Sequence, residues 1–179
     1  MVQSLELLLD EGSESALRGS WDALAAAGLP SLASHTSETN RPHVTVAAAE
    51  EGLDGALDAV RAVVAGWGLG TGGLAAVVGS PVLFGGAKQR WVLARQIVPS
   101  RPLLTLHAAV HRALSEHAPE AEVDPQTTPD GWTAHVTLSR RMPADRLAEA
   151  LAVVDPEPIP FRFTGLRFWD SPSRTVTDL

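Results

Sequence analysis

The sequence of 179 residues contains no cysteine, no tyrosine and a single lysine, Lys88. The absence of cysteine excludes disulfides and thiolate metal ligands. Basic residues are outnumbered by acidic ones, 14 to 21, which gives a formal net charge of −7. Broad, sequence-independent binding to a nucleic-acid backbone needs an extended basic surface, so long duplexes are disfavoured as partners.

The sequence also lacks a long hydrophobic run. No stretch approaches the length needed to cross a bilayer, and the N-terminus has neither the basic start nor the apolar run of a secretion signal. We therefore expect no membrane partner and a cytoplasmic location. Hydrophobic residues make up 45% and charged residues 20% of the chain, which is typical of a globular protein with a real core.

One short pattern occurs twice, as Arg41-Pro42-His43-Val44-Thr45-Val46 and as Thr133-Ala134-His135-Val136-Thr137-Leu138. On a strand, side chains alternate between two faces. Each copy would therefore present one histidine and one threonine together and send its apolar residues into the core. Two imidazoles can act as base and acid, and two hydroxyls can hydrogen-bond a charged group being displaced. The pattern makes phosphoester chemistry the leading hypothesis.

The two motifs occupy equivalent places in two similar half-repeats, about 1–85 and 88–170. Alternation and helical spacing predict strand, helix, strand, helix, strand in each half. The predicted strands are 2–9, 42–47, 74–78, 90–98, 134–139 and 160–168. Four helices are predicted. The first carries Leu17, Trp21 and Leu24, with Ser13 as its N-cap, and the second carries the apolar stripe from Leu53 to Val64. The third covers 102–117, and the fourth covers 143–154 with Leu147, Leu151 and Val154 facing inward. Residues 66–73 and 84–89 are predicted to be connections.

Such self-similarity predicts a duplication with pseudo-twofold symmetry. We expect an α+β fold of two pseudo-symmetric lobes, each a sheet covered by helices, with a central cleft that carries both motifs. The lobes are expected to interleave within a single bilobal domain over 1–179 that acts as a monomer.

The paired motifs resemble those of the 2H phosphoesterase superfamily, which includes 2′-5′ RNA ligase-like proteins and RNA 2′,3′-cyclic phosphodiesterases. The resemblance extends over the whole chain in element order, and the second motif continues as His135-Val136-Thr137-Leu138-Ser139-Arg140, as is frequent in that family. It implies a cyclic phosphodiesterase that opens 2′,3′-cyclic phosphates of RNA ends or nucleotides, usually to a 2′-phosphate, with 2′-5′ ligation as the reverse reaction. The partner would be an RNA terminus or a small cyclic nucleotide.

The resemblance also implies roles for individual residues. His43 and His135 would be base and acid in an order that the sequence leaves open, and Thr45 and Thr137 would bind the non-bridging phosphate oxygens. Arg140 is a candidate phosphate ligand, since a guanidinium offers fixed donors. Arg41, Phe84 and Trp169 are further candidate substrate contacts, the aromatic pair because no tyrosine is present to stack on a base. The arrangement requires no cofactor and no metal.

Other interpretations remain open. Half-buried strands can carry a surface histidine and threonine without function. His107 and His111 have the i, i+4 spacing of a zinc site but no third ligand in the sequence, and His107 fits a place beside the apolar stripe of a helix. Alternative functions are a non-catalytic module that binds RNA or nucleotides and a hydrolase of another small cyclic phosphate.

Overall fold

The computed structural model describes residues 2–35, 37 and 39–179. Its strands are β1 (Gln3–Leu9), β2 (His43–Ala49), β3 (Leu74–Gly85), β4 (Arg90–Ile97), β5 (His135–Pro143), β6 (Ile159–Asp170) and β7 (Thr175–Asp178). Its α-helices are α1 (Glu11–Ala26), α2 (Leu57–Gly66), α3 (Arg101–His117) and α4 (Leu147–Val153). Both half-repeats thus follow the predicted order of strand, helix, strand, helix, strand.

The strands form one antiparallel sheet in the order β2-β1-β6-β3-β4-β5, with β7 on β6. The counterparts in the two half-repeats are β1 and β4, β2 and β5, and β3 and β6. Each strand and its counterpart lie at equal distances from the two ends of this order, which is what pseudo-twofold symmetry requires. The long strands β3 and β6 pair with each other through their first residues, Leu74↔Phe163 to Val78↔Ile159, and then diverge. From there β6 pairs with β1 and β3 pairs with β4. The sheet is therefore two three-stranded lobes joined at the centre, as the predicted fold class requires.

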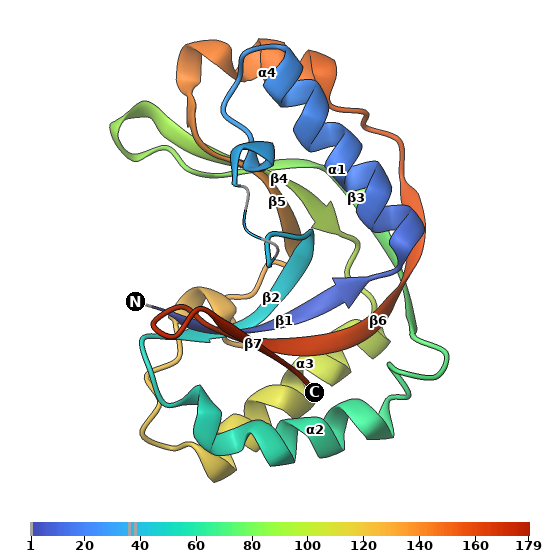
Figure 1. Cartoon of the computed structure of the whole chain (residues 1–179), viewed down its shortest axis with the longest axis vertical. Helices are drawn as coiled ribbons and strands as arrows, with labels where there is room; N and C mark the ends of the chain where they lie inside the picture. The colour runs from blue at the N-terminus through green and yellow to red at the C-terminus, as the bar shows by residue number, and fades with distance from the viewer. Residues whose placement is uncertain (1, 36, 38) are drawn as a thin grey trace.

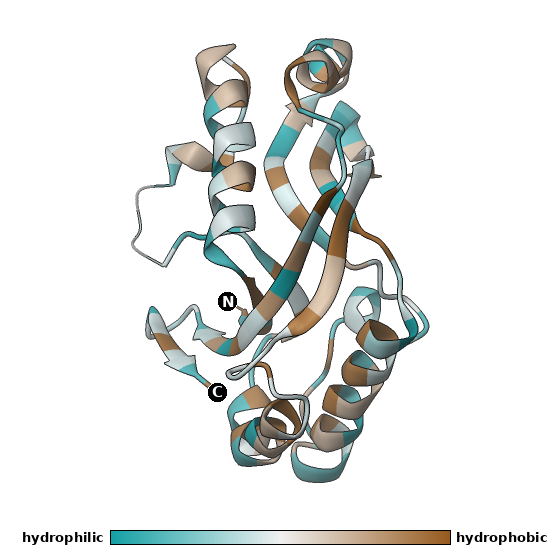
Figure 2. Ribbon diagram, turned by 90° about the vertical axis from the view of Figure 1, so that its right-hand side faces the viewer, coloured by the Kyte–Doolittle hydropathy of each residue, from teal (hydrophilic) through white to brown (hydrophobic). Residues whose placement is uncertain are grey.

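The helices exchange between the lobes. Helix α1 follows β1 but packs against α4 and β5, whereas α3 follows β4 but packs against α2 and β2. Figure 1 shows α1 and α4 at one end of the molecule and α2 and α3 at the other. Figure 2 shows apolar and polar residues alternating along the strands and helices. Each lobe is completed by a helix from the other half of the sequence, so the lobes cannot form independently of each other.

Several local predictions need correction. Helix α1 starts earlier than predicted, because the side chain of Asp10, not Ser13, accepts a hydrogen bond from the backbone at the first turn. In α4, Leu151 is 43% exposed and Ala150 takes the inward position. Strand β3 continues to Gly85, so Phe84 belongs to a strand and not to a connection. Strand β7 was not predicted.

Among the described residues, no helix is long and apolar enough to span a bilayer.

Candidate active site

The two motif strands lie at opposite ends of the sheet order and turn toward each other, so that β2 and β5 come into contact. On β2, Val44 and Val46 are fully buried, whereas His43 and Thr45 are half-buried on the other face. The second motif has the same alternation on β5. Burial of each large apolar side chain stabilises the fold by about 1.5–3 kcal/mol. The apolar residues therefore fix which face of each strand carries the histidine and the threonine.

Both motif histidines are held in the same way by the backbone. Nδ1 of His43 lies 2.7 Å from the carbonyl oxygen of Arg41, and Nδ1 of His135 lies 2.7 Å from that of Thr133. A carbonyl oxygen can only accept a hydrogen bond, so Nδ1 carries the proton in each ring. The other nitrogen, Nε2, accepts a proton in the neutral ring and donates one in the imidazolium. Either ring can therefore transfer a proton through Nε2.

The backbone of the two motif threonines is fixed by tryptophan side chains. Trp132 Nε1 donates to the carbonyl oxygen of Thr45 over 2.8 Å, and Trp21 Nε1 donates to that of Thr137 over 3.1 Å. Edge strands leave backbone groups without a partner in the sheet, and the indoles supply one partner to each strand. Each indole comes from the opposite half-repeat. The two motifs are thus tied to each other's half of the chain.

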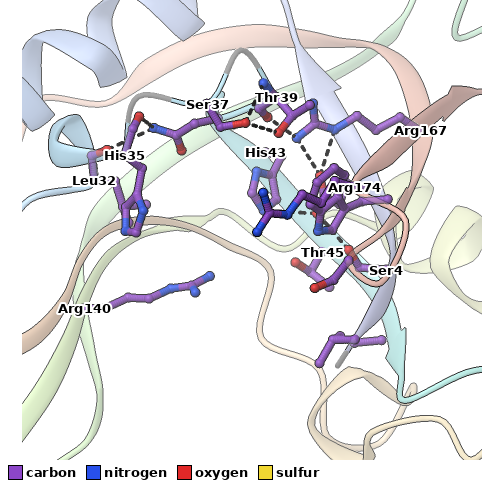
Figure 3. Close-up of a pocket in the computed structure, with 16 residues that line it drawn as sticks. Ser4, Leu32, His35, Ser37, Thr39, His43, Thr45, Arg140, Arg167 and Arg174 are labelled. Atoms are coloured by element: carbon purple, nitrogen blue, oxygen red, sulfur yellow. Dashed lines mark hydrogen bonds and ion pairs between the residues drawn. The ribbon is translucent and has the colours of Figure 1, made fainter.

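A pocket of about 730 Å³ lies beside β2. Its lining comes from β1, β2, the loop after α1, β5, β6 and the turn between β6 and β7, and Figure 3 shows these side chains converging. The polar and aromatic residues of its lining are Ser4, Glu6, His35, Ser37, Thr39, Asn40, His43, Thr45, Arg140, Arg167, Trp169, Ser171 and Arg174. Ligand pockets for small molecules typically have this size.

A buried ion pair lies beneath His43. Glu6 and Arg167, each 4% exposed, face each other on β1 and β6 with Arg167 Nε 2.8 Å from Glu6 Oε2. Ser4 donates to Glu6 Oε1 over 2.7 Å, and Arg167 also donates to the carbonyl of Thr39. The same Oε1 lies 3.5 Å from Nε2 of His43. A fixed carboxylate therefore faces the nitrogen of His43 that is available for proton transfer.

His135 has a different environment. Its ring lies against Phe84, with 4.5 Å between the ring centroids. Burial lowers the pKa of His135 below its ordinary value; the bond to the Thr133 carbonyl opposes this, and the positive charges of His43 and Arg140 lower the pKa further. Each of these charges disfavours a second positive charge nearby. His135 is therefore favoured as the neutral partner of the pair.

His107 and His111 of α3 serve the scaffold. His107, 2% exposed, stacks on Trp132 at 3.8 Å between centroids, and its Nε2 lies 3.1 Å from the carbonyl of Val46. His111 Nε2 lies 3.0 Å from the same oxygen. Burial lowers the pKa of His107 to about 4, and the charge of His111 lowers it too. Within the described ranges, no three histidine, aspartate or glutamate side chains cluster in a way that could hold a metal ion. Both rings instead anchor the strand that carries His43.

The predicted substrate contacts occupy different positions. Arg140 and Trp169 line the pocket. Phe84 contacts His135 and is absent from the lining of this pocket. Arg41 turns away to Glu14 on α1, with its Nη2 2.6 Å from Glu14 Oε2. Its side chain therefore supports the loop before β2, while a role in binding substrate stays a prediction.

Sequence reasoning missed Glu6, Arg167 and Arg174. The first two interrupt otherwise apolar strands, Leu5 to Leu9 and Leu166 to Phe168. An acid flanked by leucines in one strand and a base flanked by Leu166 and Phe168 in another are the signal that points to such a buried pair. Arg174 follows a polar turn and carries no comparable signal.

The twin His-x-Thr strands, and the lobes that hold them against each other, define a 2H phosphoesterase. The sequence profile of the 2′-5′ RNA ligase superfamily matches residues 13–174, and the chain belongs to this family. Family membership supports activity of the phosphodiesterase or ligase type.

Solved structures show the same fold at low sequence identity. TT0787 of Thermus thermophilus is 16% identical with a TM-score of 0.60, over 100% of this chain and 95% of that one. Usb1 of Kluyveromyces marxianus is 14% identical with a TM-score of 0.57, over 99% and 97%. LigT of E. coli, complexed with 3′-AMP, is 13% identical with a TM-score of 0.54, over 99% and 93%. No curated protein matches the sequence significantly.

Proposed function

We propose that this protein is a metal-independent 2′,3′-cyclic phosphodiesterase that acts on RNA ends or nucleotides through two-histidine acid and base catalysis. The observation that carries the proposal is the matched pair of His43 and His135, each with Nδ1 bound to a backbone carbonyl and Nε2 available. Such a pair supplies one proton acceptor and one proton donor on facing strands. General acid or base action typically contributes about 10²–10⁴-fold in rate.

The surroundings of the two rings support a different role for each within this proposal. His135, whose pKa is lowered chiefly by burial, is the base that takes a proton from the attacking water. His43, which forms an ion pair with Glu6 when protonated, is the acid. As the water oxygen bonds to phosphorus, the bond from phosphorus to the 3′ oxygen breaks, and His43 donates its Nε2 proton to that oxygen. The product is a 2′-phosphate, and attack by a 5′-hydroxyl in place of water would break the same bond and form a 2′-5′ linkage, which is ligation.

The other motif residues stabilise the charge that develops on the phosphate. Thr45 lines the pocket and Thr137 occupies the equivalent place on β5, so each hydroxyl can donate to a non-bridging oxygen. Arg140 adds a guanidinium that lines the same pocket as Thr45. Solved neighbours with this fold hold nucleotides, uridine monophosphate in Usb1 and 3′-AMP in LigT, which supports a nucleotide in the pocket.

The proposal is tested by incubating the protein in EDTA with an oligonucleotide that ends in a 2′,3′-cyclic phosphate and, separately, with a 2′,3′-cyclic mononucleotide. Phosphorus NMR identifies the products. We expect a 2′-phosphate from at least one substrate and none from His43→Ala or His135→Ala. Binding without turnover would favour a nucleotide-binding module. Turnover of a different small cyclic phosphate, without turnover of these two substrates, would favour a hydrolase of that phosphate. Activity that requires added Zn²⁺, Mn²⁺ or Mg²⁺ would overturn the metal-independent mechanism.

A further inference from the structure

The pocket contains a second cationic position besides the motifs. Arg174 lies in the turn between β6 and β7, and its side chain lines the same pocket as Arg140. Figure 3 shows the two arginines entering the pocket from opposite sides, Arg140 from β5 and Arg174 from the C-terminal hairpin. Two guanidinium groups that face one space favour an anionic ligand there.

The charges of the three pocket arginines are not equivalent. Arg167 is paired with the carboxylate of Glu6, so this pair contributes little net charge to the floor of the pocket. In the part of the chain that the structure describes, no carboxylate lies within ion-pair distance of Arg140 or Arg174. Among the pocket arginines of the described residues, Arg140 and Arg174 are therefore the two without a carboxylate partner.

An aromatic side chain, Trp169, lines the pocket on the strand that leads into the C-terminal hairpin. Sheet register places Glu6 opposite both Thr45 and Arg167, and places Ser4 opposite Trp169. Neighbouring strands lie about 4.8 Å apart, so Trp169 on β6 is roughly 10 Å across the sheet from β2. Val2 and Ala48 line the pocket with Trp169. An indole with small apolar neighbours suits the stacking of a base or the contact of a ribose.

The hairpin fixes where Arg174 enters. The backbone of Ser171 donates to the carbonyl of Val2, and Ser173 Oγ donates to Asp170 Oδ2 over 2.6 Å. Strand β7 then pairs with β6 from Asp170↔Thr175 onward. The hairpin is thus held at the rim of the pocket, on the Trp169 side.

We propose that Arg174, with Ser171, binds a second phosphate group, the 5′ phosphate of the nucleotide whose 2′,3′-cyclic phosphate lies at the motifs. The ligand class is a nucleotide with phosphate on both sides of its ribose, which is the terminal nucleotide of an RNA strand. A nucleoside 2′,3′-cyclic phosphate would leave the Arg174 position empty. This inference rests on the proposed function for the placement of the first phosphate.

The test measures binding, so it does not depend on turnover. The probes are adenosine 2′-monophosphate and adenosine 2′,5′-bisphosphate, which differ only in the 5′ phosphate. Dissociation constants are measured by calorimetry for the wild type, Arg174→Gln, Arg174→Lys and Arg101→Gln. Arg101 is an exposed arginine at the start of α3, outside the pocket lining, and serves as the matched control.

We expect the wild type and Arg101→Gln to bind the bisphosphate about tenfold or more tightly than the monophosphate, as a charged hydrogen bond provides. In Arg174→Gln this ratio falls toward one, and in Arg174→Lys it is partly restored. The salt dependence of bisphosphate binding also becomes weaker in Arg174→Gln, because one phosphate contact is lost.

Three results would overturn the inference. They are a wild type without preference for the bisphosphate, an unchanged ratio in Arg174→Gln, and an equal loss of affinity for both probes in that variant, which would place Arg174 at the first phosphate. Failure of the proposed function has a different signature, namely absent turnover of cyclic substrates while the binding ratios hold.

Discussion

The carboxylate oxygen Oε1 of Glu6 lies 3.5 Å from Nε2 of His43, the ring nitrogen that the Arg41 carbonyl leaves available for proton transfer. Glu6 also accepts from Ser4 and pairs with Arg167. The carboxylate is therefore fixed by groups that do not belong to either motif. It faces the ring nitrogen through which a general acid at this position would donate its proton.

Replacement of Glu6 by glutamine tests both parts of this arrangement. The change removes the negative charge beside buried Arg167, and breaking one side of a buried ion pair typically costs about 3–5 kcal/mol. We expect a lower free energy of unfolding in urea and a lower kcat/KM at temperatures where the variant is folded. Glu149→Gln is the control, because its ion pair with Arg146 is on the surface. Equal stability of the two variants would contradict the importance assigned to the buried pair.

Alanine at either motif histidine should abolish most turnover and leave the fold intact, because both rings are only half-buried beside the site. We expect a loss on the order of 10²–10⁴-fold for each variant. Activity and circular dichroism are measured on the same samples. Near-normal turnover in His43→Ala or His135→Ala would refute the two-histidine mechanism.

Valine at Thr45 or Thr137 keeps the β-branched shape and removes one donor to the phosphate. We expect kcat to fall by about 10²–10³-fold, by analogy with the loss of one oxyanion donor. Thermal stability should change little, since both side chains are half-buried on the strand face opposite the buried apolar residues. A change in stability with unaltered kinetics would assign these threonines to the scaffold.

The acidic limb of the pH profile depends on the base. A base must be neutral to accept a proton, and the lowered pKa of His135 keeps it neutral below its ordinary value of 6.5. We therefore expect kcat/KM to persist to a pH below 6.5 before it falls. Arg140→Gln removes one of the charges that lower this pKa, so its acidic limb should move to higher pH. Arg141→Gln, whose side chain is outside the pocket lining, should leave the limb in place.

His107 makes the stability of the fold depend on pH. Its pKa is about 4 in the folded protein against an ordinary 6.5, so the unfolded chain binds a proton more tightly. The stabilisation is fully present above pH 6.5 and decreases as the pH falls toward 4, by roughly 3 kcal/mol in all. We expect urea unfolding to show this loss in the wild type and a smaller one in His107→Gln. His117→Gln, at the exposed end of α3, should behave as the wild type.

The motif strands and the order of elements could be predicted because their determinants are local. Alternation around His43 and His135 is read directly from neighbouring residues, and it holds in the structure. The equivalent places of the two motifs were enough to predict a duplicated fold. Apolar spacing likewise identified α1 and α3, although it placed the start of α1 too late.

The remainder of the site depends on contacts between distant residues. Glu6 and Arg167 are 161 positions apart, and only the pairing of β1 with β6 brings them together. The indole of Trp21 donates a hydrogen bond to the carbonyl of Thr137, a residue 116 positions away in the sequence. Strand β7 has four residues, too few for a recognisable alternation, so neither the hairpin nor the entry of Arg174 could be foreseen.

The pairing of β1 with β6 has a consequence for the synthesis of the chain. The lobe that carries His43 is completed by β6, which ends at Asp170. When the first motif has just emerged from the ribosome, the strand that lies next to β1 has therefore not yet been made. The second motif also precedes β6 in the sequence. The sheet that carries both motifs is therefore incomplete until β6 has emerged. Topologies dominated by such distant pairings fold slowly, and we expect catalytic competence to appear in a single step after β6 has been translated.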